Sequence, residues 1–437
     1  MKPILALLAA WMVAAVPAWA EIEIEDVTSP GGVHAWLVEE HSIPFVALEI
    51  RFRGGTSLDA EGKRGAVNLM TGLIEEGAGD MDARAFARAQ ESLAASFSFG
   101  AGDDSVSVSA QFLTENRDQA AALLRDTLHA PRFDPDAIER VRAQVVSGLL
   151  SDAKDPNDIA GSAFSELAFG THPYGSDGKG TVESVTALTR DDILAAKDAV
   201  FARDRLYVGA VGDITAEELG ALVDQLLADL PETGAPIPGP AELGLDGGVT
   251  VIEFDTPQSV ALFGQRGIAQ EDDDFFAAYV LNQILGGGSF ESRLMTEVRE
   301  KRGLTYGIYT YLAPGDFGAL YMGRFSSANG RVAEALGILR EEWARMAEEG
   351  VTEAELEDAK RYLTGAYPLR FDGNERIADQ LLGLQTAGLD IDYVNERNDL
   401  VEAVTREDIA RVARRILDPD RLTFVVVGRP EGVQATN

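Results

Sequence analysis

The sequence contains no cysteine among its 437 residues. Disulfide bonds and a lipid-modified N-terminal Cys are therefore excluded. Histidine is scarce, with 4 residues, and the 38 Lys and Arg residues are outnumbered by 72 Asp and Glu, which gives a formal net charge of -34. So acidic a chain is a poor partner for nucleic acid or for an anionic membrane surface.

The chain also lacks an apolar run long enough to span a membrane as a helix, which takes about 20 residues. The apolar run at residues 4–16 follows Lys2 and precedes Ala18-Trp19-Ala20, a small-residue cleavage site. These features predict a secretory signal peptide over residues 1–20, against the alternative of a retained anchor, and a soluble mature chain from Glu21. Export without disulfides requires a large core, which a chain of this length can build, and it fits the bacterial periplasm.

The second half of the chain repeats the first. Residues 185–212 recur without a gap as residues 401–428, a spacing of 216. Each copy predicts a T-x-x-D helix start, an amphipathic helix, an Asp-Arg-Leu turn and a strand. Residues 231–248 are rich in Pro and Gly, which indicates a linker. We therefore predict two similar domains, at residues 21–230 and 249–437.

Earlier in each half, Val46-Ala47-Leu48 and Val260-Ala261-Leu262 open similar strands. Strands such as 106–112 are grouped with helices such as 332–349, which stops at Gly350 before a capping box at Thr352. This grouping favours an α+β fold, in which helices pack on one face of a mainly antiparallel sheet. Two such domains facing each other would form a cleft, arranged as one half of a clamshell.

The most informative segment of the sequence runs from Gly286 to Tyr306. A helix over 272–285 is predicted to stop at the glycines, a second helix spans 292–302, and a strand spans 304–311. Arg299 then lies on the helix and Tyr306 on the strand. The glycine loop alone could suggest phosphate binding, but it lacks the Lys-Ser/Thr of a P-loop and the spacing of a dinucleotide motif.

This segment, GGGSFESRLMTEVREKRGLTY, resembles the substrate-clamping segment of the pitrilysin, insulinase and mitochondrial processing peptidase family of zinc proteases. The resemblance implies that Arg299 and Tyr306 are a catalytic pair and that Gly286, Gly287 and Gly288 bind substrate. A phenol or guanidinium aimed at the scissile carbonyl stabilises the charge that develops there, and Arg can also hold an extended peptide through forked hydrogen bonds. The alternative is an ordinary helix, loop and strand with a surface ion pair and a packed ring.

Family members that cut peptides carry an inverted zinc motif, H-x-x-E-H, near the N-terminus. The matching helix of this sequence has Asn68, Thr71 and Gly72 at the His, Glu and His positions. The third ligand of the family, a Glu on a later helix, would fall near Ser147-Gly148. Asn, Thr and Gly supply neither the usual zinc ligands nor a general base.

The remaining histidines offer no substitute site. His34 and His41 stand seven apart in strand-like sequence, His129 follows a Leu-rich helix, and His172 begins an H-P-Y-G turn like that of the family, so no two have ligand spacing. Glu75 and Glu76 could be considered as replacement acids, but acids at a helix end are usually a solvated face. We therefore predict that this chain binds no metal.

The resemblance thus implies a periplasmic subunit that is inactive alone. A homologous H-x-x-E-H partner would hold the zinc and the general base, while this chain would supply Arg299 and Tyr306 to hydrolyse peptides held between the two subunits. One alternative is a non-proteolytic peptide-binding or structural subunit, as in relatives that serve as core proteins of a respiratory complex, although a scaffold has no need of the Arg/Tyr pair. The other is an active peptidase with an unrecognised site.

Overall fold

The structure is a computed structural model that describes residues 22–288 and 290–436. The predicted signal peptide, residues 1–20, lies outside the described residues. None of the helices in the described ranges combines the length and apolar composition that crossing a membrane requires.

The first half builds a six-stranded sheet in the order β1-β2-β8-β3-β7-β6. All neighbouring strands are antiparallel except β2 and β8, which are parallel. The strands are β1 (Glu25–Thr28), β2 (His34–Glu39), β3 (Phe45–Arg53), β6 (Ser96–Ala101), β7 (Ser105–Leu113) and β8 (Leu206–Gly212).

The second half builds a five-stranded sheet in the order β11-β12-β10-β13-β9, again with a single parallel pair, β13 and β9. Its strands are β9 (Gly248–Glu253), β10 (Gln258–Arg266), β11 (Ile308–Gly315), β12 (Gly318–Ala328) and β13 (Thr423–Gly428). Apart from β1, the two orders match strand for strand, as the internal repeat predicts. Val211 pairs with Ala47, and its repeat partner Val427 pairs with Val260. By strand pairing, Val260 therefore corresponds to Ala47, one residue beyond Val46, with which the sequence pattern aligns it.

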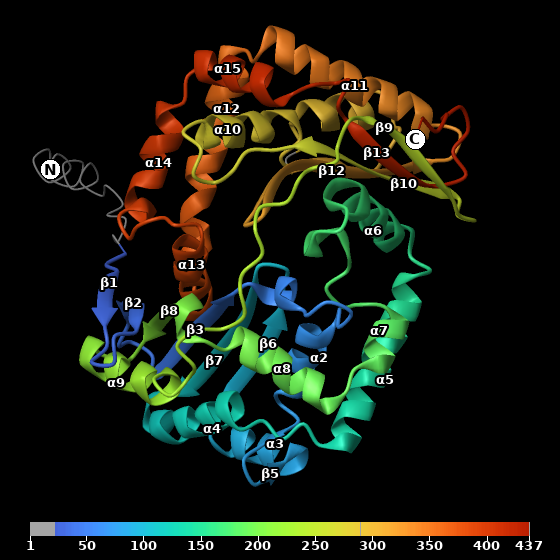
Figure 1. Cartoon of the computed structure of the whole chain (residues 1–437). Helices are drawn as coiled ribbons and strands as arrows, with labels where there is room; N and C mark the ends of the chain where they lie inside the picture. Colours follow the sequence, from blue (N-terminus) through green and yellow to red (C-terminus); the bar gives the residue numbers. More distant parts are fainter. Residues whose placement is uncertain (1–21, 289, 437) are drawn as a thin grey trace, which may run out of the picture.

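Helices lie on the outer side of each sheet, and others flank them at the sides of the molecule (Figure 1). In the first half they are α2 (Ala66–Leu73), α3 (Ala83–Ser92), α4 (Arg117–His129), α5 (Pro135–Asp152), α7 (Val182–Ala187), α8 (Arg190–Val200) and α9 (Ala216–Leu227), with a short hairpin of β4 (Gly77–Ala78) and β5 (Met81–Asp82). In the second half they are α10 (Phe275–Leu285), α11 (Val332–Glu349), α12 (Glu353–Ala366), α14 (Tyr393–Ala403) and α15 (Arg406–Ile416). The predicted capping boxes at Thr189, Thr352 and Thr405 are present. The predicted α+β fold is confirmed.

Each half also sends one helix across to the sheet of the other half (Figure 1). Helix α6 (Pro156–Phe169) packs on β10 and β13, and α13 (Asn374–Thr386) packs on β3 and β8. Glycines make room for both: a Cβ at Gly264 would lie 2.9 Å from Cζ of Phe164, and one at Gly209 would lie 2.6 Å from Cδ1 of Leu382. The inner faces of the sheets are therefore buried by exchange between the halves.

Polar contacts reinforce this exchange. Gln385 of α13 donates a 2.9 Å hydrogen bond to the Val208 carbonyl of β8. Arg53 of β3 forms a 2.5 Å ion pair with Asp316 in the β11–β12 turn. Within residues 231–248, Ala241 N donates to the carbonyl of Phe317 at 2.6 Å. The predicted linker is thus fastened to the second half where it passes.

Glu49 gives the junction of β3 and α13 a dependence on pH. Its side chain is 5% exposed and accepts a 2.7 Å hydrogen bond from Ser109. Burial raises the pKa of Glu49 to about 7, helped by Asp379 and Glu375 of α13 and opposed by Ser109 and Arg51. Because the folded pKa is raised, the contribution of Glu49 to stability is fully present below its unfolded pKa near 4.5 and is lost as pH rises through about 7.

We expect Glu49→Gln to weaken this dependence. Between pH 5 and pH 8, the free energy of unfolding of the parent chain should fall by on the order of 2–3 kcal/mol more than that of the variant, as the size of the pKa shift implies. Urea unfolding at the two pH values measures the difference. Glu61→Gln, on an exposed turn, serves as the matched control, and equal pH dependence in both variants would contradict the assignment.

Candidate functional site

Helix α2 carries the three positions that we predict to correspond to the zinc motif. Asn68 is half-buried, Thr71 is buried and Gly72 is exposed. The Thr71 hydroxyl donates a 2.9 Å hydrogen bond to the Asn68 carbonyl within the same helix. No side chain at these positions therefore presents a group that fits zinc.

The place of the third ligand is equally unsuited to a metal. Ser147 and Gly148 are exposed on α5, and neither carries a carboxylate. Helix α5 approaches α2 with an apolar side chain, since a Cβ at Gly72 would lie 3.2 Å from Cγ1 of Val141. Among residues 22–288 and 290–436, no group of three or more His, Cys, Asp and Glu side chains could hold a metal ion.

The four histidines lie apart, each with its own partner. His41 contacts Asp213 at 2.7 Å and Glu39 at 3.1 Å. The partners of His34, His129 and His172 are the Thr28 hydroxyl, the Leu226 carbonyl and the Gly239 carbonyl. The residues that the structure describes therefore do not fit zinc.

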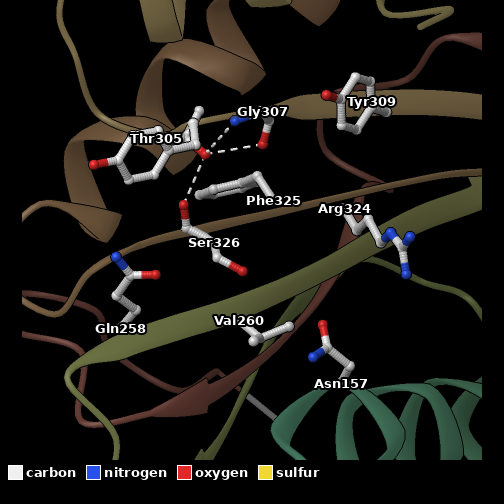
Figure 2. A pocket seen from close by; sticks show the side chains of 10 residues that line it. Asn157, Gln258, Val260, Thr305, Gly307, Tyr309, Arg324, Phe325 and Ser326 are labelled. Atoms are coloured by element: carbon white, nitrogen blue, oxygen red, sulfur yellow. Dashed lines mark hydrogen bonds between the residues drawn. The ribbon is translucent and has the colours of Figure 1, made fainter.

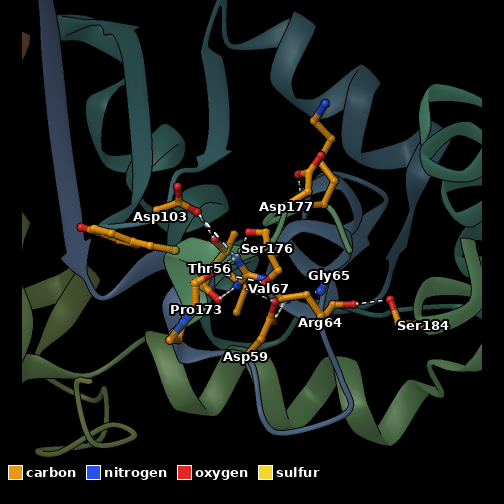
Figure 3. A network of polar contacts seen from close by, with 12 residues as sticks. Thr56, Asp59, Arg64, Gly65, Val67, Asp103, Pro173, Ser176, Asp177 and Ser184 are labelled. Atoms are coloured by element: carbon orange, nitrogen blue, oxygen red, sulfur yellow. Dashed lines mark hydrogen bonds and ion pairs between the residues drawn. The ribbon is translucent and has the colours of Figure 1, made fainter. Parts of the chain in front are cut away.

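A network of polar contacts fixes the loop that leads into α2 (Figure 3). Arg64 donates to the carbonyls of Pro173 at 2.9 Å and Ser176 at 2.8 Å, and also to the carbonyl of Thr56. The Asp59 carboxylate accepts hydrogen bonds from the first backbone amides of the helix region, Gly65 N and Val67 N, both at 2.8 Å. The helix of the lost zinc motif is thus firmly positioned against the H-P-Y-G turn.

Sequence reasoning missed this network because a single Arg and a single Asp before a helix form no recognisable motif. The structure also shows a cavity of about 410 Å³ beside the network, lined among others by Asn68, Asp103, Asn157, Tyr174 and Lys179. Groups of both charge signs face this cavity, together with the first position of the degenerate motif.

Arg299 lies in a six-residue π-helix, Met295–Glu300, inside the predicted helix 292–302. π-Helical turns are rare and frequent at functional sites. The Arg299 guanidinium lies 4.8 Å from the centroid of the Phe290 ring, a cation–π contact, and within the described residues it has no ion pair. Glu297, two residues earlier on the helix, is occupied by Lys301 at 2.6 Å and Arg302 at 2.8 Å, and the adjacent Glu300 forms no ion pair among the described residues. The positive charge of Arg299 is therefore not neutralised by its own helix.

Tyr306 lies in a bend before β11, so its predicted place on a strand is wrong. The Thr305 hydroxyl causes the bend: it accepts a 3.1 Å hydrogen bond from Gly307 N and donates a 2.7 Å bond to the Ser326 carbonyl (Figure 2). This local turn delays strand pairing until Ile308. The Tyr306 side chain is 87% exposed and has no hydrogen-bond partner among the described residues.

Tyr306 lines a cavity of about 610 Å³ with Gln258, Tyr309 and Arg324 of the second half and Asn157 of α6 (Figure 2). Asn157 also lines the cavity at Asn68. Tyr306 and helix α2 therefore line adjoining cavities. Arg299 is absent from the lining of either, and no hydrogen bond joins it to Tyr306 within the described ranges.

The loop Gly286–Gly288 has a packing reason for its glycines. A Cβ at Gly286 would lie 2.4 Å from Oγ1 of Thr310, and one at Gly287 would lie 2.6 Å from Cα of Gln283. Gly287 and Gly288 line a separate cavity of about 390 Å³. Their predicted part in substrate binding stays a prediction.

Comparison with known proteins places these features in one family. A family profile described as the peptidase M16 inactive domain matches residues 187–363. The chain is 28% identical over 397 residues to the non-peptidase homolog YmxG of Helicobacter pylori, which covers 89% of this chain and 90% of that protein. It is 26% identical over 428 residues to an uncharacterized zinc protease of Streptomyces coelicolor, which covers 94% and 91%.

Solved structures agree. The peptidase M16 inactive domain from Pseudomonas fluorescens has a TM-score of 0.87 and 29% identity, with 94% of this chain and 99% of that chain covered. A protease from Helicobacter pylori has a TM-score of 0.83, with 93% and 100% covered, and at 16% identity it shows the shared fold alone. The chain is thus similar over nearly its whole length to proteins of the peptidase M16 family, and its residues 187–363 match the profile of the inactive domain of that family.

Proposed function

We propose that this chain is the zinc-free subunit of a two-subunit periplasmic zinc peptidase. It supplies Arg299 and Tyr306, while a homologous partner that carries H-x-x-E-H supplies zinc and the general base. The observation that carries the proposal is an asymmetry within one chain. Among the described residues, the side chains of Arg299 and Tyr306 have no ion-pair or hydrogen-bond partner, whereas helix α2 has no side chain that fits zinc.

The chemistry of the pair supports this division of labour. When water adds to a peptide carbonyl, negative charge develops on the carbonyl oxygen, and a phenol or guanidinium donor stabilises it. Tyr306, at 87% exposed, is free to meet a substrate carried by another polypeptide. Arg299 has forked donors suited to peptide carbonyls, and its cation–π contact with Phe290 is weak enough to be exchanged for them, at about 0.5–1 kcal/mol for an exposed pair.

Reconstitution tests the proposal. The purified mature chain and an exported H-x-x-E-H homologue from the same genome are assayed separately and mixed, with a quenched fluorescent peptide library as substrate. We expect chelator-sensitive hydrolysis to appear or to rise at least tenfold on mixing. A partner whose motif Glu is replaced by Gln should give no activity. Chelator-sensitive hydrolysis by the present chain alone, in a preparation free of the partner, would contradict the proposal.

A non-proteolytic peptide-binding or structural subunit is the second candidate. One observation favours it: Arg299 stacks on Phe290 and does not line the cavity of Tyr306. A complex that forms on mixing but hydrolyses peptides at the same rate with Arg299→Ala as with the parent chain would favour this candidate.

The export of the chain belongs to the same proposal. We expect the mature protein to be recovered from the periplasmic fraction with Glu21 at its N-terminus, as N-terminal sequencing would show.

A further inference from the structure

Two arginines of the second half surround an aromatic cavity without any acid to balance them. Arg397 of α14 is only 4% exposed, and Arg370 lies in the 3-10 helix Tyr367–Phe371. Both line the cavity of about 390 Å³ beside the glycine loop and an adjoining cavity of about 250 Å³. Among the described residues, no carboxylate lies within 4.0 Å of either guanidinium. In a chain with a net charge of -34, this is an unusual concentration of unpaired positive charge.

The neighbours of Arg397 only partly compensate its burial. It donates hydrogen bonds to the Leu363 carbonyl at 2.9 Å, to the Asn398 side-chain oxygen at 3.0 Å and to the Tyr279 hydroxyl at 3.2 Å. Its Cζ lies 4.6 Å from the ring centroid of Tyr367 and 5.4 Å from that of Tyr279. These contacts are neutral, whereas a buried charge is normally paired with an opposite charge.

Tyr367, which lies beside the arginines, can also still donate a hydrogen bond. The Tyr367 hydroxyl is buried and has no hydrogen-bond partner, and burial raises its pKa to about 12, so it remains a protonated donor. Gln283 and Tyr362 line the same cavity. An anion entering here would meet two guanidinium groups and aromatic walls, and it would meet no competing acid.

We propose that this site, the Arg397 pocket, binds the carboxylate of a peptide. Planar guanidinium groups match the two oxygens of a carboxylate, and the cavity volume is within the range typical of small-ligand sites, about 300–1,000 Å³. Tyr309 lines both the Arg397 pocket and the cavity of Tyr306. A peptide anchored by its carboxylate can therefore extend past Tyr309 toward the proposed Arg/Tyr site. Only the choice of a peptide as the ligand rests on the proposed function.

Binding to the chain alone tests the inference, without a partner and without hydrolysis. The probe is a hexapeptide of Gly, Ala and Phe with an N-terminal fluorescein, made with a free C-terminal carboxylate and as the C-terminal amide, and binding is followed by fluorescence anisotropy. We expect the free acid to bind at least tenfold more tightly than the amide. An amide peptide with one internal Glu distinguishes the two sources of the group. If it binds as the plain amide does, the pocket selects the C-terminus, and if it binds as the free acid does, a side-chain carboxylate also serves.

Two arginine variants in the pocket and one control variant outside it separate binding from folding. Arg370 is exposed, so Arg370→Gln should fold normally and reduce the preference for the free acid to about twofold or less. Arg361→Gln is the matched control, because Arg361 is an exposed Arg on α12 whose side chain pairs with Asp358, and it should keep the full preference. Arg397→Lys keeps the charge but loses the fork and should also weaken binding of the free acid.

Equal binding of the free acid and the amide by the parent chain would overturn the inference, as would an unchanged preference in Arg370→Gln. Because the assay contains no partner, failed reconstitution with a preserved preference for the free acid would reject the two-subunit peptidase and leave the Arg397 pocket standing. Successful reconstitution together with equal binding of the free acid and the amide would reject only the Arg397 pocket.

Discussion

Tyr306→Phe should lower kcat of the reconstituted two-subunit peptidase by about 10²–10³-fold, the loss typical when one donor to the developing oxyanion is removed. The substitution removes a single hydroxyl from a side chain that is 87% exposed, so the fold and the association of the subunits should be unaffected. Arg299→Ala should lower kcat/KM by a similar factor and also raise KM, because the guanidinium is expected to hold the substrate as well. Steady-state kinetics on one fluorogenic peptide gives both numbers.

The control for this pair is Arg302→Ala, in the turn that follows the π-helix. Arg302 forms a 2.8 Å ion pair with Glu297 and lines none of the cavities described above, so kcat should stay within about twofold of the parent. Equal rates for the parent, Tyr306→Phe and Arg299→Ala would reject the catalytic role of the pair and leave the chain as a structural or peptide-binding subunit.

Phe164→Ala should destabilise the protein by about 3–5 kcal/mol, the usual cost of removing a fully buried Phe side chain. Phe164 belongs to the first half, yet it is 0% exposed and packs in one cluster with Val260, Val425 and Val427 of the second sheet. The cavity left behind would weaken the exchange of helices that joins the halves. Urea denaturation measures the change in free energy of unfolding.

Leu369→Ala is the matched control for Phe164→Ala, since Leu369 is 73% exposed and should change stability by less than about 0.5 kcal/mol. If Phe164→Ala costs less than about 1 kcal/mol, the packing of α6 on the second sheet is not a main support of the fold.

Features encoded by neighbouring residues could be predicted from the sequence. The repeat at Thr189 and Thr405 marks two capping boxes, because the Thr and Asp of each box lie only three residues apart. Helix α11 ends at Glu349 before Gly350, as predicted, since Gly adopts the left-handed backbone found there at φ 69°. The absence of H-x-x-E-H can likewise be read from the sequence, because the motif depends on residue identity at fixed spacing, and the assignment of its positions to Asn68, Thr71 and Gly72 stays a prediction.

Features that depend on contacts distant in sequence could not be predicted. The crossing of α6 and α13 depends on Gly264 and Gly209, whose lack of a side chain admits a helix from the other half. The alternating pattern through Thr305 predicts a strand at Tyr306, but the Thr305 hydroxyl donates to the Ser326 carbonyl, 21 residues away, and the chain bends there. The pocket around Arg397 cannot be predicted from the sequence, because the residues that surround Arg397 come from three other helical segments of the second half.

The zinc content of the purified chain, prepared without any partner, tests the central claim most directly. Elemental mass spectrometry after dialysis against trace zinc should find far less than one zinc per chain, because Asn68 and Gly72 stand at the positions of the two His ligands and Thr71 at that of the general base. One tightly held zinc per chain, removable only by a strong chelator, would contradict the account.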